Sequence, residues 1–191
     1  MLSVFAMLIH CVMESDDIFV GVPIADRSVS KFEDTIGLLM NAFTIRIDLS
    51  ENPTLVEVAV AAHRAFTEAY EHRHIPYEYL IRSLGCREGA APFPFRVVFN
   101  YLNVPQAVMA LNGVECERIA VPPVPPAAAD VSLHVHDNRS DLKCTVIAST
   151  RVWTTRMAAI EKMFESAINS FLAAPGERVS QFTLSERSRA S

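Results

Sequence analysis

Charge is scarce in this sequence, and lysine is the scarcest charged residue. Only 20% of the 191 residues are charged and 50% are apolar, whereas a typical soluble domain carries about 25% charged residues. Lysine occurs only at Lys31, Lys143 and Lys162, and the net charge is −5. Nucleic acid attracts proteins through basic clusters, so we exclude it as a partner. The apolar excess predicts a folded domain with some apolar surface that a partner covers.

Cysteines are few, and the short motifs of common enzyme classes are missing. The four cysteines are Cys11, Cys86, Cys116 and Cys144. None of them belongs to a C-x-x-C pair, which argues against a zinc site. The sequence contains no Walker loop, G-x-G-x-x-G, G-x-S-x-G or H-E-x-x-H. Because nothing favours an oxidising compartment, we expect free thiols and a cytoplasmic protein.

The residues from Leu2 to Met13 are almost all apolar, with Ser3 and His10 as exceptions. A bilayer span needs about 20 apolar residues, so we expect no membrane segment here. A helix that is apolar on all sides belongs in the interior of a protein. As the first element of the chain it looks like the middle of a domain, so we expect that a segment which should precede it is absent and that the helix belongs to a surface that another body covers.

Hydrophobic periodicity divides the rest of the chain into strands and helices. Short β-branched or alternating segments predict five strands: Ile18–Ile24, Leu38–Leu49, Phe95–Tyr101, Val131–His136 and Leu142–Ser149. Apolar residues at three-and-four spacing predict three more helices: Thr54 to about His72, Tyr77–Leu84 and Thr155–Leu172. Thr54 and Glu57 have the spacing of a capping box. The order predicts an α/β sandwich, a mixed sheet with helices packed on it.

Two polar features have more than one interpretation. His134 and His136 share one face of a predicted strand and, with Asp130, are candidate metal ligands. Half-exposed structural histidines are the alternative that we favour, so we expect no metal. Arg27 closes an apolar strand and Arg46 lies within one, so each needs a carboxylate or carbonyl partner. A structural ion pair is the simplest explanation for both arginines.

Four segments have an order and spacing that are specific as a set. Asp16–Arg27 is similar to the pattern DDIVVGTPVAGR, Ile36–Arg46 to IGxFVNTxxxR, and Glu71–Leu80 to HQDxPFExL. Pro94–Tyr101 is similar to the strand that follows these patterns in the same family. Together they resemble the carboxy-terminal half of a nonribosomal peptide synthetase condensation domain, which belongs to the chloramphenicol acetyltransferase-like superfamily.

The resemblance implies a single chloramphenicol acetyltransferase-like α/β lobe over residues 1–185. We expect residues 186–191 to be a disordered tail, because chain ends fray unless they are tied down. In the family, the active site lies between two lobes, where carrier proteins deliver donor and acceptor for amide bond formation. The catalytic motif HHxxxDG belongs to the amino-terminal lobe, and this sequence has no His-His pair. We therefore expect no catalytic residue, no metal and no cofactor in this chain, and no activity without the other lobe.

The resemblance also implies roles for individual residues. Arg27 looks like the arginine that pairs with the Asp of HHxxxDG, and an Arg–carboxylate fork suits that bracing role. Asn41 and Arg46 would lie on or beside the channel wall. The other matched motif positions are Gly37, His72 and Pro76. The sequence departs from the family at Ala42, where Thr is usual, and at Arg73-His74, where Gln-Asp is usual.

The expected partners are peptidyl or acyl carrier proteins with phosphopantetheine arms, and either the missing amino-terminal lobe or a second copy of this chain. Leu102–Ala129 contains the proline-rich run Val121–Pro126, and we expect it to cross to the other lobe or a neighbour. Two other functions stay open. One is part of a stand-alone acyltransferase with a carrier protein or coenzyme A donor; the other is a non-catalytic module that binds carrier proteins. A cyclisation domain is an alternative subtype.

Overall fold

The computed structural model describes residues 1–25, 35–85, 96–103, 113–114, 129–138, 141–149 and 157–182. Within these ranges the chain forms five strands: β1 Asp17–Ala25, β2 Met40–Asp48, β3 Val97–Leu102, β4 Val131–Asp137 and β5 Leu142–Ala148. The same ranges contain four α-helices and a short 3-10 helix: α1 Leu2–Met13, α2 Leu55–Glu71, α3 Tyr77–Ser83, α5 Met157–Ala173 and η2 Val179–Gln181. Every predicted helix and strand is present, and the ends differ by a few residues.

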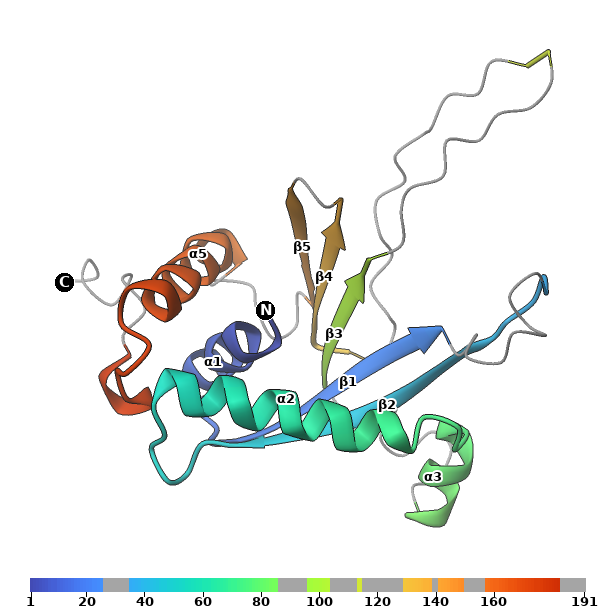
Figure 1. The fold of residues 1–191 in the computed structure, drawn as a ribbon, viewed down its shortest axis with the longest axis horizontal. Coiled ribbons are helices and arrows are strands. Elements are labelled where there is room, and N and C mark those ends of the chain that lie inside the picture. The colour runs from blue at the N-terminus through green and yellow to red at the C-terminus, as the bar shows by residue number, and fades with distance from the viewer. Residues whose placement is uncertain are drawn as a thin grey trace.

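The five strands form one mixed sheet in the order β2-β1-β3-β4-β5 (Figure 1). β1, β3 and β4 are parallel, and β2 and β5 pair antiparallel at the two edges. β2 begins at Met40 and not at the predicted Leu38, because its partner β1 ends at Ala25, opposite Met40. The predicted mixed-sheet α/β sandwich is confirmed.

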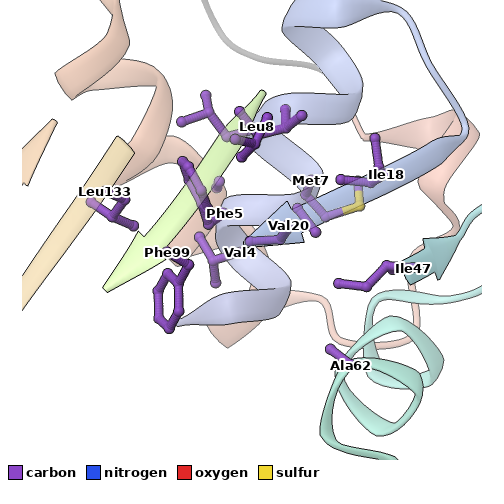
Figure 2. Close-up of a cluster of buried hydrophobic side chains, with 14 of the residues drawn as sticks. Val4, Phe5, Met7, Leu8, Ile18, Val20, Ile47, Ala62, Phe99 and Leu133 are labelled. Atoms are coloured by element: carbon purple, nitrogen blue, oxygen red, sulfur yellow. The ribbon is translucent and has the colours of Figure 1, made fainter. Parts of the chain in front are cut away.

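Helix α1 lies in the middle of the core. It contacts α2, α5 and β1, and every side chain from Ser3 to Ile9 is buried. Figure 2 shows Phe5 and Leu8 of this helix among side chains of the sheet. The expectation that another body covers α1 is wrong, because the sheet and the other helices of this same lobe bury it.

Helices α1, α2 and α5 pack on one face of the sheet (Figure 1). The strand residues that point toward them are almost fully buried, as Val20, Ile45 and Leu133 show with 0–1% exposure. Side chains at the alternate positions, such as Phe19 and Arg46, point to the opposite face. No helix in the described ranges covers this second face, which we call the open face.

Helix α2 begins with the predicted capping box. The hydroxyl of Thr54 accepts a hydrogen bond from the backbone N–H of Glu57 at 3.3 Å. The Glu57 carboxylate accepts one from the backbone N–H of Thr54 at 2.7 Å. Two backbone donors at the helix start therefore have partners within one turn, which is why the sequence pattern was sufficient to locate this end.

The segment that follows α5 completes the start of α2. The backbone N–H of Leu55 donates to the carbonyl oxygen of Glu177 at 2.9 Å, and that of Val56 donates to Pro175 at 3.0 Å. Val179 of the same segment is 4% exposed and belongs to the core. Helix α2 thus depends on residues from the other end of the chain.

Two predicted features fall largely or wholly outside the described residues: the crossover Leu102–Ala129 and the tail 186–191. They stay predictions. In the part of the chain that the structure describes, no helix combines the length and apolar character that a membrane crossing requires.

Candidate functional site

Asn41 lies in β2 and binds the connection between α2 and α3. Its Nδ2 group donates to the carbonyl oxygen of Arg73 at 2.7 Å and to that of Ile75 at 2.8 Å. Its Oδ1 accepts from the backbone N–H of Tyr77 at 3.0 Å. Both amide protons and one lone pair of the carboxamide are thus used inside the chain.

The hydrogen bonds of Asn41 connect two family motifs that are separate in the sequence. His72 is the C-cap residue of α2, and Pro76 immediately precedes the first residue of α3. These two motif residues flank the segment that Asn41 binds. Gly37 lies in the segment that leads into β2. Asn41, His72 and Pro76 therefore belong to one local structure.

The departure from the family at Arg73-His74 is compatible with this arrangement. Asn41 binds the backbone carbonyl of Arg73 and not its side chain, so a change of side chain leaves the bond intact. The guanidinium of Arg73 lies over the ring of Tyr70, 4.3 Å from its centroid. This cation–π contact is of a kind that stabilises exposed sites by about 0.5–1 kcal/mol.

Arg46 lies on the open face and has the carboxylate partner that the sequence predicts. Its Nε donates to Asp17 at 2.7 Å and its Nη2 to the other oxygen of the same carboxylate at 3.2 Å. Oδ2 of Asp48 lies 3.6 Å from Nη2 of Arg46. The guanidinium carbon of Arg46 lies 6.0 Å from the centroid of the Phe19 ring. The hydrogen bond and charge of Asp17 raise the pKa of Arg46. The ion pair is exposed and links β1 to β2.

Asn41 and Arg46 do not line one surface. Successive side chains of a strand point to opposite faces, and along β2 the buried residues Phe43 and Ile45 share the face of Asn41. Arg46 points the other way. The two residues that the resemblance assigns to a channel wall therefore stand on opposite sides of the sheet, with Asn41 directed at the α2–α3 connection.

A polar network on the open face was missed by the sequence analysis. Nδ1 of His134 lies 3.4 Å from Nδ2 of Asn100, and its Nε2 lies 3.2 Å from the Ser132 hydroxyl. Burial lowers the pKa of His134, and the neighbouring His136 lowers it further. A neutral imidazole fits these partners, because Nδ1 then accepts from the amide and Nε2–H donates to the hydroxyl.

Two of the three candidate metal ligands, Asp130 and His134, have other partners. Asp130 forms an ion pair with Arg96, and His134 uses both ring nitrogens as described. Within the described ranges, no group of three His, Cys, Asp or Glu side chains is placed to hold a metal ion. The network could not be found from sequence, because Asn100 stands opposite His134 only through the register of β3 and β4.

Arg27 lies outside the described residues. Its pairing with the Asp of HHxxxDG is not tested by the structure and stays a prediction.

Comparison with known proteins settles the family. The model of the condensation domain family matches residues 1–191. This chain belongs to the condensation domain family. A dimodular nonribosomal peptide synthase of Bacillus subtilis is 28% identical over 124 residues, which is 64% of this chain and 5% of that protein. Surfactin synthase subunit 1 of the same organism is 24% identical over 186 residues, or 96% of this chain and 5% of that protein. The chain thus spans a small part of these relatives.

Solved structures share the fold over nearly all of this chain. The X-domain from teicoplanin biosynthesis has a TM-score of 0.80 and 19% identity, with 95% of this chain matched to 43% of that one. The condensation domain from Monacolin K polyketide synthase MokA has a TM-score of 0.77 and 22% identity, with 93% matched to 42%. The chain matches these structures as a single lobe, as the resemblance predicted.

Proposed function

We propose that this chain is the carboxy-terminal lobe of a condensation domain that forms amide bonds together with an amino-terminal lobe carrying HHxxxDG. The observation that carries the proposal is the extent of the match, because 95% of this chain corresponds to only 43% of a solved relative. The open face supports it. Its half-buried polar groups, Asn100 and His134 among them, suit one wall of a chamber that a second lobe completes.

In this proposal the second lobe supplies the proton-handling imidazole. An amine on the acceptor carrier protein attacks the thioester carbonyl on the donor carrier protein. The new C–N bond forms as the C–S bond breaks; the amine loses one proton and the leaving phosphopantetheine sulfur gains one to become the thiol, and the imidazole handles these protons. The role of this lobe is to support the site, with Arg27 paired to the Asp of HHxxxDG. The thioesters and reduced cysteines fit a cytoplasmic setting.

A second candidate is a non-catalytic module that binds a partner protein. The observation that favours it is the fold likeness to the teicoplanin X-domain, which has been solved in complex with OxyB; that structure has a TM-score of 0.74 and 21% identity to this chain. For this chain the corresponding partner would be a carrier protein that binds without turnover. The stand-alone acyltransferase with a coenzyme A donor is the third candidate.

The decisive experiment combines this chain with the amino-terminal half of a condensation domain. Donor and acceptor carrier proteins are loaded with thioesters, and the amide product is measured by mass spectrometry. We expect product only when both lobes are present, and none when the second His of HHxxxDG is replaced by alanine. Arg27→Ala should lower turnover, whereas Arg64→Ala, an exposed arginine of α2, should not.

The alternatives give different results in the same assay. Product from this chain alone would refute the proposal. Binding of loaded carrier proteins without product, with every amino-terminal half tried, would favour the module. Turnover with coenzyme A thioesters in place of the loaded donor would favour the acyltransferase. Sedimentation tests the assembly separately: a monomer at high micromolar concentration contradicts pairing with a second copy.

A further inference from the structure

Helix α3 has little of its own to hold it in place. It comprises seven residues, and isolated helices shorter than about 12–15 residues are marginal in water. Tyr77 is its buried residue, while Tyr79 is 67% exposed and Leu80 39% exposed. Its N-cap position is Pro76, which makes no side-chain capping bond. Support for the start of this helix must therefore come from elsewhere in the lobe.

We propose that Asn41 caps α3 from the neighbouring strand and thereby acts as a positioning residue. Asn is among the best N-cap residues because its side-chain oxygen accepts from backbone donors at the start of a helix. Here the oxygen comes from β2, not from the chain just before the helix, and accepts from the N–H of Tyr77 at 3.0 Å. Tyr77 is the first residue of α3, so Asn41 provides an acceptor for one of the N-terminal backbone donors that have no partner within the helix.

The other half of the carboxamide fixes its orientation. Nδ2 donates to the carbonyl oxygens of Arg73 and Ile75 at 2.7 and 2.8 Å. Exchanging the nitrogen and oxygen would place Oδ1 against two carbonyls and Nδ2 against the N–H of Tyr77, which leaves all three groups without a complementary partner. Only a residue with two donors and one acceptor in this geometry meets the three demands, and aspartate, with the same shape, does not.

The functional part of this inference rests on the condensation activity proposed above. The resemblance places Asn41 on or beside the channel wall, but the polar atoms of its side chain bind the α2–α3 connection. Asn41 therefore affects turnover through the placement of α3 and of the segment between His72 and Pro76, not through contact with substrate. Its replacement should displace this segment while the sheet stays intact.

Hydrogen exchange of the whole chain tests the cap directly. In Asn41→Ala we expect the Tyr77 amide and the α3 amides to lose about 30-fold or more in protection, because three hydrogen bonds are removed. The amides of β3 and β4 should change by less than about threefold. Asn169 is exposed on α5, and Asn169→Ala serves as the matched control that leaves α3 protected.

Asn41→Asp adds a readout that loss of packing cannot imitate. Its carboxylate still accepts from Tyr77 but repels the two carbonyl oxygens, so α3 should be poorly protected at neutral pH. Protonation of the carboxyl restores one donor, so the protection factors of α3 should recover as the pH falls through the carboxyl pKa. Asn41→Ala should show no such recovery. If Asn41→Ala destabilises the whole lobe, protection is lost throughout the chain. In that case Asn41→Asp tests the cap: as the pH falls, the protection factors must recover more in α3 than in β3 and β4.

The outcomes separate this inference from the proposed function. Wild-type protection of α3 in both Asn41 variants overturns the cap. In the two-lobe assay we expect kcat/KM to fall about tenfold or more in the Asn41 variants and to stay unchanged in Asn169→Ala. Full turnover with an unprotected α3 overturns the positioning role. If the wild-type lobe is inactive with every amino-terminal half, the proposed function fails, and hydrogen exchange still decides whether Asn41 caps α3.

Discussion

Shortening Leu8 to alanine tests whether α1 is the centre of the core. Leu8 is 0% exposed and lies on a helix that the sheet, α2 and α5 surround. Leu→Ala at buried sites costs about 2–5 kcal/mol, from lost burial and from the cavity left behind. Because rigid elements surround α1, the site has little room to collapse, and we expect the upper half of this range, about 3–5 kcal/mol. At about 2–4 °C per kcal/mol, Tm should fall by about 10 °C.

The assay is urea unfolding of Leu8→Ala beside Leu172→Ala. Leu172 lies on α5 and is 77% exposed, so the same chemical change there should cost less than about 0.5 kcal/mol. Leucine and alanine both favour helices, so a change in helix propensity does not explain a difference between the two sites. If the two variants unfold within about 1 kcal/mol of each other, α1 is not buried within the lobe.

Three further predictions concern caps and pH. Thr54→Ala removes the hydroxyl acceptor of the α2 capping box and should cost about 1 kcal/mol in urea unfolding; Thr67→Ala, within the exposed part of the same helix, should cost less. Burial and His136 lower the pKa of His134. The contribution of neutral His134 to the free energy of unfolding is therefore fully present above the unfolded-chain pKa of about 6.5. It is lost as the pH falls through the lower pKa of the folded state. A pH series of unfolding should show this slope, and His134→Gln should flatten it; an identical slope in the variant contradicts the assignment. Hydrogen bonds from Thr54 lower the pKa of Glu57. The contribution of ionised Glu57 to the free energy of unfolding is therefore present above the unfolded-chain pKa of 4.5 and is lost as the pH falls through the lower pKa of the folded state. Glu57→Gln should remove this pH dependence.

Local patterns predicted the elements of this fold well. The capping box of Thr54 and Glu57 lies within one helical turn, and its hydrogen bonds need no knowledge of the rest of the chain. The all-apolar run Leu2–Met13 predicted an interior helix, and α1 is one. The same run misled on what covers it, because composition shows that a helix is buried but not by which body.

The candidate site was harder to predict because its contacts join distant parts of the chain. Tyr77 is 36 positions from Asn41, and His134 is 34 positions from Asn100. Only the pairing of strands and the packing of α3 bring these groups together. One relation was within reach of the sequence: apolar residues alternate through Phe43 and Ile45, and this period of two places Asn41 on the buried face and Arg46 opposite.

The bonding of α2 to the segment after α5 has a consequence for synthesis. The N–H groups of Leu55 and Val56 find their acceptors on Glu177 and Pro175, which leave the ribosome long after α2 itself. At about 5–20 residues per second, the first turn of α2 waits on the order of 10 s for these carbonyls. During translation the first turn of α2 therefore lacks two of its native hydrogen-bond acceptors, and it gains them only after residues 175–177 have left the ribosome.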